Sequence, residues 1–518
     1  MISKLARIFS AELEGIDAKL IEIEIDINVA LHSFTIVGLA DKALSEAKER
    51  VNSALKNSGF KPPTKENRKI TVNLAPANIQ KTGSQYDLGI AVGYLLATGQ
   101  IKNFDSKNKL FIGELALDGS LRPVYGALNI SCLGEKLKFD EIILPKANSK
   151  EASLVSGIKI IPAQNLEEVL NHLEGRIVIP HSPKTSIKKP NNAENFEFDF
   201  EDIKGQESAK RALIVAASGN HNLLMVGPPG SGKTMLAKAL NSILPELESE
   251  EIIEISKIWS AAGFLKEQFN LNSRPFRQPH HSASATAVIG GGANPRPGEI
   301  SLAHRGVLFF DELPEFHRDV LEALRQPLES GKISISRVKN NLTFPARFQF
   351  ITAMNPCPCG FYNDPEKKCR CTAYEVFRYQ KKISGPLIDR IDLQISVPRL
   401  KIEQLKSTQK TKSQEIKNLI TEAREIQKNR FKKANLNILT NAEMTSKHCE
   451  QMIQLNKEAD DFIKQVFDKS LLSARGYFRI LKVSQTIADL EKSQIIKLSH
   501  ITEAFQYRLK NNIDSNLE

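Results

Sequence analysis

Residues 226 to 234 read V-G-P-P-G-S-G-K-T, and this stretch decides the fold of the middle of the chain. It matches the phosphate-binding loop pattern G-x-x-x-x-G-K-[ST] from Gly227 to Thr234. An apolar run at Leu223–Val226 precedes the loop, and helical periodicity at Met235–Ile243 follows it. The sequence therefore predicts a strand, a loop and a helix, which is the setting in which this pattern binds a nucleotide.

The residues of the predicted loop have distinct tasks in holding a polyphosphate. Glycines let backbone N–H groups converge on phosphate oxygens, and the N-terminus of the following helix adds favourable partial charge. Lys233 is placed to reach the β- and γ-phosphates of ATP, and the Thr234 hydroxyl to hold Mg²⁺. The predicted nucleotide-binding residues are Gly227, Pro228, Pro229, Gly230, Ser231, Gly232, Lys233 and Thr234.

A second segment supplies the acid groups that such a site needs. The run G-V-L-F-F-D-E from Gly306 to Glu312 reads as an apolar strand that ends in two carboxylates. Asp311 is placed to take up Mg²⁺ through water, and Glu312 to orient and deprotonate the attacking water. Alone, the run could equally be a buried strand followed by an acidic helix cap. Together with the phosphate-binding loop it predicts a nucleotide hydrolase rather than a protein that only binds nucleotides.

Length and composition are those of an ordinary protein of several domains. The 518 residues suggest about three domains, and 41% of them are hydrophobic and 25% charged. No apolar stretch is long enough to span a membrane, and Met1–Leu20 contains Glu12, Glu14 and Asp17 where a signal peptide needs an apolar core. We therefore expect a cytoplasmic protein without a membrane partner. The net charge of +11 permits a nucleic-acid partner without requiring one.

The order of predicted elements divides the chain into four parts. Residues 1–178 alternate strand-like and helical segments, and 179–196 form a linker rich in proline, lysine and asparagine. Residues 197–398 mix strands with helices, and 399–518 are almost wholly helical. In the first part we predict strands at Leu20–Val29 and Lys69–Leu74 and helices at Asp41–Ser58 and Leu88–Thr98. In the last part we predict helices at Ile402–Phe431, Asn441–Leu455, Lys457–Ser470, Ser473–Lys492 and His500–Leu509.

Four of the six cysteines are clustered, at Cys357, Cys359, Cys369 and Cys371. In a reducing compartment, clustered cysteines indicate a metal before a disulfide. Four thiolates are the usual ligands of a structural, tetrahedral Zn²⁺ site. Because the two C-x-C pairs are tighter than common zinc-finger spacing, free thiols remain an alternative to Zn²⁺.

Several further motifs occur in one order, and jointly they resemble the magnesium-chelatase-like branch of the AAA+ ATPases over essentially the whole chain. The resemblance implies an α/β protein with three folded parts. These are an N-terminal Lon-protease-like (ribosomal S5 domain 2-like) α+β domain, an AAA+ phosphate-loop α/β core and a C-terminal all-α lid. The motifs, besides the phosphate-binding loop, lie at Asp202–Gln206, Arg274–Ser284, Gly306–Leu313, Thr352–Gly360, Ser384–Asp392 and Ser473–Leu481.

The resemblance also implies roles for three residues outside the loop. Asn355 matches the sensor-1 residue that hydrogen-bonds the attacking water or the γ-phosphate, and Arg475 matches the sensor-2 arginine of the lid. Arg390 matches the arginine finger, which in this family reaches the ATP of a neighbouring subunit and can raise the rate by several powers of ten. A surface or capping residue is the alternative for each of them. A finger that acts between subunits implies a ring, and the rings of the family are hexamers.

Two segments resemble parts that line the central channel of related helicases. Ile333, Ile335 and Val338 predict one strand of a hairpin, and Leu342 and Phe344 begin a second. At the tip of this pre-sensor-1 hairpin, Arg337 and Lys339 are candidates for contacts to DNA phosphates, with an ordinary solvated hairpin as the alternative.

The segment 264–292 resembles the helix-2 insert of the family. Its Arg274, Arg277, His280 and His281 are possible DNA contacts. A metal site at the two histidines is disfavoured, because adjacent side chains of an extended segment are expected to point opposite ways.

The N-terminal part departs from Lon protease where catalysis would occur. Alignment of Lys81–Ala91 with the nucleophile motif puts Asp87 at the position of the serine, and the catalytic lysine falls on Leu128. Ser84 is nearby, but no activating base is evident in the matching place. We therefore expect a scaffold or DNA-binding role without peptidase activity.

The resemblance implies an ATP-driven DNA motor. It would be a hexameric helicase or translocase that uses ATP and Mg²⁺, acts on single-stranded and branched DNA, and promotes branch migration during natural transformation. A motor subunit of a metal chelatase and an ATP-dependent protease-related chaperone remain alternatives. The N-terminal part and the cysteine cluster disfavour the first, and the replaced dyad disfavours the second.

Overall fold

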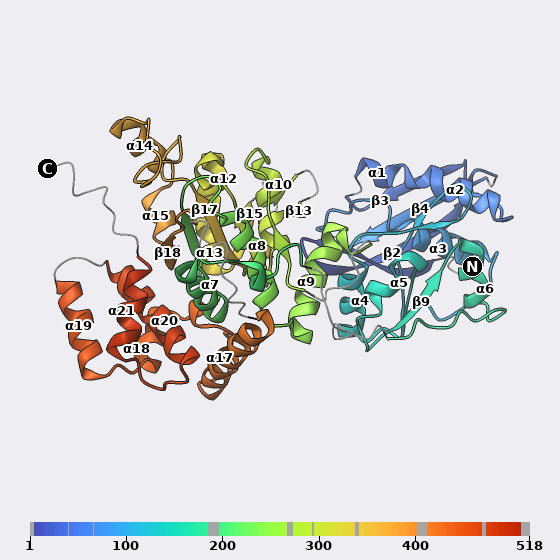
Figure 1. Ribbon diagram of the computed structural model, residues 1–518. Helices are drawn as coiled ribbons and strands as arrows, with labels where there is room; N and C mark the ends of the chain where they lie inside the picture. The colour runs from blue at the N-terminus through green and yellow to red at the C-terminus, as the bar shows by residue number, and fades with distance from the viewer. Residues whose placement is uncertain are drawn as a thin grey trace.

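The computed structural model describes residues 5–39, 41–65, 67–184, 196–266, 273–292, 295–336, 341–400, 412–468 and 473–508. These residues form an N-terminal α/β part, a central α/β part and a C-terminal helical part (Figure 1). The mixed α/β class and the helical C-terminal region agree with the prediction. None of the helices within these ranges combines the length and the apolar character needed to cross a membrane.

The N-terminal part is built on a seven-stranded sheet with the strand order β3-β4-β2-β1-β5-β8-β9. Strand β2 alternates isoleucines with charged residues, and Ile21, Ile23 and Ile25 are fully buried on one face. This period of two explains why the strand prediction at Leu20–Val29 is confirmed. The strands are β1 (Ala6–Glu14), β2 (Asp17–Val29), β3 (Ser33–Val37), β4 (Arg68–Ala75), β5 (Lys109–Phe111), β8 (Glu141–Pro145) and β9 (Lys159–Ala163).

Helices cover this sheet, and one predicted helix is divided. The predicted segment Asp41–Ser58 forms α1 (Lys42–Ser45) and α2 (Ala47–Asn57), with a break at Glu46. The apolar helix predicted at Leu88–Thr98 is confirmed as α3 (Asp87–Thr98), which is buried over almost its whole length. The remaining helices are α4 (Ala127–Lys136), α5 (Ser149–Ala152) and α6 (Leu166–Leu173).

The central part contains a five-stranded sheet with the order β11-β14-β17-β10-β18, and all its paired strands are parallel. The carboxyl ends of these strands therefore meet at one edge, where ligands bind in open α/β sheets. The strands are β10 (Leu223–Val226), β11 (Phe276–Arg277), β14 (Val307–Phe310), β17 (Gln349–Met354) and β18 (Leu393–Ser396). The helices named below are α7 (Glu207–Gly219), α8 (Lys233–Ile243), α9 (Ser249–Ala262), α12 (Arg318–Ala323), α13 (Arg325–Ser330), α14 (Ala373–Gln380) and α15 (Gly385–Ile388).

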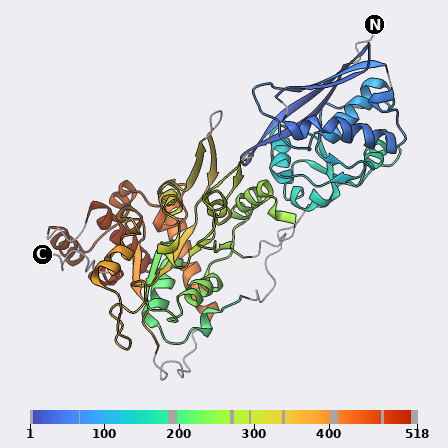
Figure 2. The same ribbon diagram turned by 90° about the horizontal axis from the view of Figure 1, so that it is seen from above.

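The predicted hairpin is present as two antiparallel strands, β15 (Lys332–Ser336) and β16 (Asn341–Pro345). Its tip, with Arg337 and Lys339, lies outside the described residues. The base of the hairpin packs against the turn between β1 and β2, where a Cβ built at Gly15 would lie 3.7 Å from the Phe344 ring. The long β1–β2 ribbon reaches from the N-terminal part to this point (Figure 2).

Helix α9 joins the central part to the N-terminal part. Its Ile255, Ile258 and Trp259 belong to one buried apolar cluster with Leu128 of α4 and strand residues of the N-terminal sheet. The Ser260 hydroxyl donates to the Glu151 carboxylate at 2.7 Å, which adds a buried polar contact. Figure 1 shows α9 beside α4, between the two sheets.

The C-terminal part is helical, as predicted, with changes at the helix ends. Its helices are α17 (Ser413–Lys433), α18 (Ser446–Met452), α19 (Lys457–Asp468), α20 (Ala474–Leu490) and α21 (Leu498–Gln506). The start of the helix predicted at Ile402–Phe431 lies outside the described residues. The single helix predicted at Asn441–Leu455 is wrong, because Thr445 caps α18 and separates it from a 3-10 turn at Asn441–Glu443.

Candidate nucleotide-binding site

The phosphate-binding loop follows β10 and leads into α8, as the motif predicts. Gly232 caps α8 with a φ of 89°, a left-handed conformation that favours glycine. Gly227 is required for a different reason, because a Cβ there would lie 2.2 Å from the Val397 carbonyl oxygen. Local sequence thus shapes the loop, and β18 packs directly against its first residue.

Lys233 lies at the centre of the loop and is only 8% exposed. Its Nζ donates to the carbonyl oxygens of Gly227 and Pro228 at 2.7 and 2.9 Å and to Oδ1 of Asn355 at 3.2 Å. Burial lowers the pKa of Lys233, and the carboxylates of Asp311 and Glu312 act in the opposite direction. The lysine is therefore held within the loop, close to the residue predicted as sensor 1.

The predicted Mg²⁺ ligands are brought together by β10 and β14, which flank β17. The Thr234 hydroxyl donates to Oδ2 of Asp311 at 2.6 Å. A hydroxyl and a carboxylate oxygen are the hard ligands that Mg²⁺ prefers, so the pair fits this ion. Glu312 has a left-handed φ of 54°, and its side chain is 55% exposed beside the loop. Asn355 follows β17, the strand between them.

Two residues beside the loop were not predicted as site residues. Nε2 of Gln206 donates to the Pro398 carbonyl at 2.6 Å, and Nη2 of Arg399 reaches the Pro229 carbonyl at 3.4 Å. Gln206 belongs to the motif at Asp202–Gln206, but no sequence pattern around Arg399 predicts a site residue there. Only the pairing of β10 with β18 brings Arg399 to the loop.

Arg390 and Arg475 lie together and share one carboxylate. Nη2 of Arg390 donates to Glu329 at 2.5 Å, and Nη2 of Arg475 lies 3.9 Å from the other oxygen of Glu329. The hydrogen bond from Arg390 lowers the pKa of Glu329. The C-terminal helical part thus places the predicted sensor arginine beside the predicted finger.

This arginine pair lies at the end of the sheet opposite the phosphate-binding loop. The Asn222 side chain, at the start of β10, donates to the Arg390 carbonyl at 2.9 Å, whereas the loop follows Val226 at the other end. At roughly 3.3 Å per residue, the strand separates the two by about 13 Å. Lys233, Thr234, Asp311, Glu312 and Asn355 therefore gather at one edge, and Arg390 and Arg475 do not join them.

The four clustered cysteines converge after β17. Their sulfur atoms lie within 4.8 Å of one another, and the separation of Cys357 from Cys359 is 3.4 Å. Ligands about 2.3 Å from a tetrahedral Zn²⁺ would have sulfur atoms about 3.8 Å apart, so the group fits that ion. Backbone N–H groups of Arg370 and Phe361 lower the pKa of Cys359 to about 6, which favours the thiolate.

The cysteine loop also contacts the phosphate-binding loop. A Cβ at Gly360 would lie 2.4 Å from Cδ of Pro229, so the two backbones approach closely there. Gln380 of α14 donates to the Pro356 carbonyl at 2.9 Å and fixes the start of the cysteine loop.

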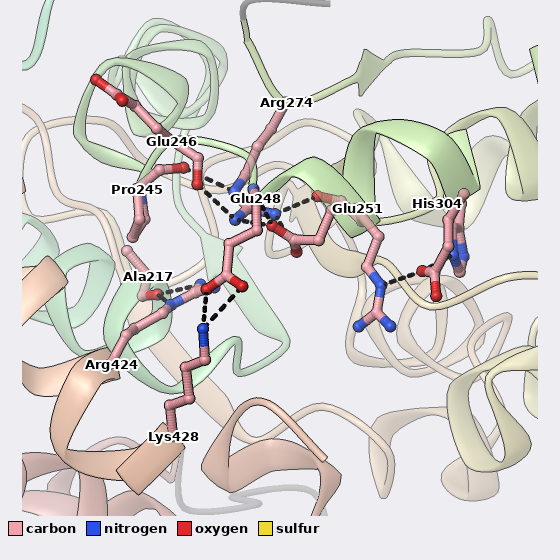
Figure 3. Close-up of polar contacts among 11 residues, drawn as sticks. Ala217, Pro245, Glu246, Glu248, Glu251, Arg274, His304, Arg424 and Lys428 are labelled. Carbon is pink, nitrogen blue, oxygen red and sulfur yellow. Dashed lines mark hydrogen bonds and ion pairs between the residues drawn. The ribbon is translucent and has the colours of Figure 1, made fainter. Parts of the chain in front are cut away.

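One arginine of the predicted insert differs from its expected role. Arg274 is only 8% exposed. Its guanidinium nitrogens donate hydrogen bonds to Glu251 and to the carbonyls of Pro245, Glu246 and Arg305 (Figure 3). The predicted DNA contact of Arg274 is therefore wrong. Arg277 makes two hydrogen bonds of 2.6 Å with Glu299 and is 27% exposed, so its DNA contact stays a prediction.

The two adjacent histidines also differ from the expectation. His280 and His281 do not point opposite ways, since their ring centroids lie 4.1 Å apart. His281 approaches Glu312, with Nδ1 at 3.9 Å from the carboxylate. The segment turns here rather than staying extended, because Ser282 donates its N–H back to the ring of His280.

In the N-terminal part, the position aligned with the Lon nucleophile is a buried ion pair. Asp87 is fully buried, and Arg50 donates to its two oxygens at 2.6 and 3.0 Å. Burial raises the pKa of Asp87 to about 6, although Arg50 opposes the rise. Leu128, aligned with the lysine, is buried in α4. The geometry has no nucleophile and base at these two positions.

The parallel sheet, the loop and the acidic strand define a phosphate-loop nucleotide-binding protein. Models of the magnesium chelatase subunit ChlI match residues 199–405 and 23–148, and a model of its C-terminal region matches 410–508. The chain is 45% identical to Competence protein ComM of Haemophilus influenzae over 97% of both chains, and 43% identical to YifB of Escherichia coli over 95% of both. It is 28% identical to the magnesium-chelatase 38 kDa subunit of Rhodobacter capsulatus, over 31% of this chain and 50% of that subunit.

The chain belongs to the magnesium-chelatase-like family that includes ComM and YifB. The AAA+ domain of this family implies ATPase activity with ATP and Mg²⁺. The predicted family resemblance is confirmed.

Proposed function

We propose that the protein is an ATP-driven DNA motor, a hexameric helicase or translocase that promotes branch migration during DNA integration in natural transformation. One observation carries the proposal: the hydrolytic residues and Arg390 lie at opposite ends of the sheet. With Arg390 as the arginine finger, a subunit would not complete its own site, and a neighbouring copy in a ring would supply the arginine. The name of the Haemophilus relative, a competence protein, supports the link to DNA uptake.

The contacts within the loop indicate how each residue acts. Lys233 would exchange its bonds to the Gly227 and Pro228 carbonyls for bonds to the β- and γ-phosphates. Because Oδ1 of Asn355 accepts from Lys233, its amide N–H₂ group is left to donate to the γ-phosphate or the attacking water. Glu312, exposed beside them, would take the proton of that water.

Mg²⁺ and the neighbouring subunit would complete the site. Thr234 and Asp311 would hold Mg²⁺, which neutralises charge on the transferred phosphate when it is bound. Arg390 of the neighbouring copy would stabilise the charge that develops during hydrolysis, and Arg475 beside it would contact the same nucleotide.

We also propose Zn²⁺ at the four cysteines, as a structural ion. It would fasten the cysteine loop against Pro229 and so keep the phosphate-binding loop and Asn355 in register. For the N-terminal part we propose a Lon-protease-like scaffold without peptidase activity, since Asp87 is engaged by Arg50.

A metal-chelatase motor subunit is the second candidate. The similarity to the Rhodobacter subunit, which covers 31% of this chain, favours it. The near-complete coverage of the competence relative and the cysteine cluster favour the DNA motor.

The two candidates differ in their response to DNA. We expect ATP hydrolysis to rise when single-stranded or branched DNA is added, and mass measurements to find a hexamer with ATP. Hydrolysis that is indifferent to both DNA forms would contradict a DNA motor.

The hairpin tip provides a second test. Replacing Arg337 and Lys339 together by alanine should weaken binding to all DNA sequences and reduce the salt slope by about one to two. Basal hydrolysis should persist, because neither residue is part of the nucleotide site. Unwinding of branched DNA equal to that of the parent would place the DNA contacts elsewhere.

A further inference from the structure

A cavity of about 710 Å³ lies between the central part and the helical lid. Eight basic side chains but only four carboxylates line it. Its outer end holds Arg390, Arg475 and Glu329, which belong to the site described above. Its inner end is a separate group, formed by Arg274, Arg305, Arg347, Arg424, Glu443 and Lys482.

Part of this inner charge is already compensated. Two carboxylates of α9 face two different segments, and Figure 3 shows this row of contacts. Glu251 binds Arg274, and Glu254 binds Arg305 at 2.9 Å. Burial alone would raise the pKa of Glu251, but Arg274 holds it below its ordinary value. The Arg274 and Arg305 side chains are only 8% and 13% exposed, so these buried pairs are not available to a ligand.

Arg424 of α17 is different, because it faces no carboxylate at ion-pair distance within the described part of the chain. Its Nε and Nη2 donate to one backbone carbonyl, that of Ala217, at 3.1 and 2.5 Å. Burial, and then the charge of Arg274, lower its pKa to about 9. A bound anion would stabilise the charged form of this guanidinium, and the Nη1 group of Arg424 remains to donate a hydrogen bond to that anion.

Two further cations adjoin Arg424 around the turn at Asn441–Glu443. Nζ of Lys482 donates to the Ala442 carbonyl at 3.1 Å. Nη1 of Arg347 donates to Glu443 at 2.7 Å, but the Arg347 side chain is 38% exposed, so Nη2 remains for a ligand. Glu443 also lies close enough to raise the pKa of Arg424, so one carboxylate serves several cations. The positive charge of the inner end is therefore only partly balanced.

The remaining walls fit an organic molecule rather than a bare ion. Phe348, Ile438 and Phe478 line the cavity beside the cations. Small-molecule sites measure about 300–1,000 Å³ and combine apolar walls with a few placed polar groups. The volume of the whole cavity lies within this range, and its inner end combines three apolar side chains with several charged ones.

We propose that the inner end of this cavity binds a phosphate-bearing small molecule, with Arg424, Arg347 and Lys482 as its phosphate ligands. These residues come from α17, the segment after β16, and α20, so the bound phosphate joins the lid to the central part. The site goes beyond the proposed motor activity, because it lies at the end of the sheet away from the phosphate-binding loop. Binding of a metabolite at this site would fix the position of the lid relative to the central part.

Calorimetric titration of the full chain carrying Lys233→Ala tests the proposal, with inorganic tripolyphosphate and AMP as the two probes. The Lys233→Ala change weakens the phosphate-binding loop, so binding that persists in the monomer reports on the cavity. We expect such binding, and a loss of about tenfold or more in affinity for Arg424→Gln or Lys482→Gln added singly. If AMP binds more tightly than tripolyphosphate, the apolar walls contact the nucleotide base. If tripolyphosphate binds as tightly as AMP or more tightly, the site recognises the phosphates alone.

Lys428→Gln is the matched control. Lys428 lies one turn beyond Arg424 on α17 and pairs with Glu248 at 2.6 Å, outside the lining of the cavity, so affinity should be unchanged. Thermal melting shows that each variant is folded.

Three results would overturn the proposal. They are no binding by the monomer, binding that appears only in assembled rings, and affinity that survives both glutamine variants. ATP hydrolysis by the parent chain is measured in parallel. Its persistence in any of these cases would leave the motor proposal standing.

Discussion

Complementation between two inactive variants tests whether Arg390 acts on a neighbouring copy. Arg390→Ala should reduce ATP hydrolysis about a thousandfold, the lower end of the contribution of an arginine finger. The fold should tolerate this change, because Arg390 pairs with Glu329, whose side chain is 61% exposed, and such pairs contribute less than about 1 kcal/mol. Loss of rate without loss of melting temperature would thus reflect the site.

The magnitude of rescue follows from the geometry. Lys233→Ala subunits keep Arg390, and Arg390→Ala subunits keep the phosphate-binding loop. In a random equal mixture, about one interface in four joins an intact loop to an intact finger, so the recovered rate should approach a quarter of the parent rate.

Phosphate release during ATP turnover measures the recovered rate, and labelled subunits show that mixed rings have formed. Arg390→Ala mixed with the double variant Lys233→Ala/Arg390→Ala is the control, because no interface in that mixture is complete. Mixed rings that stay as slow as this control would refute action between subunits.

Three further outcomes are expected. Lys233→Ala should weaken ATP binding, whereas Glu312→Gln should bind ATP but turn over at least about a hundredfold more slowly, which nucleotide titration and phosphate release distinguish; normal turnover would remove Glu312 as the base. Metal analysis of protein purified without chelators should find about one Zn²⁺ per chain, and its absence with four readily alkylated thiols would contradict the site. Burial raises the pKa of Glu12 from 4.5 to about 7, so its contribution to stability is complete below pH 4.5 and is lost as the pH rises toward 7. Glu12→Gln should remove about 3 kcal/mol of this pH dependence, and melting curves at pH 5 and pH 8 that keep the parent's slope would argue against it.

Sequence reasoning identified the parts of the site that are local in the chain. The loop at 227–234 and the strand before Asp311 have their chemistry and their secondary structure within a few residues, so both were recognisable. Glu329, which joins Arg390 to Arg475, lies more than one element away from each and carries no signal of its own. Arg399 reaches the loop only through the pairing of β10 with β18.

The error at Arg274 has its physical origin in tertiary contacts. Arg274 looks like a free basic residue in the sequence, but the fold brings Glu251 and several carbonyls around it. The division of the predicted helix 41–58 is local instead. Asp41 accepts the N–H of Leu44 and caps the first turn, and α2 begins again after Glu46. The partners of Arg274 could not be located from periodicity or composition.

The shared apolar cluster of α9 and α4 has a consequence for dividing the protein. The predicted linker at 179–196 separates two segments of sequence, but the N-terminal part uses Ile255, Ile258 and Trp259 from beyond it to complete its interior. A protease that cuts the linker should therefore leave two fragments that stay together through this interior. An N-terminal fragment produced alone would expose to water the apolar surface that α9 covers, and it would tend to aggregate.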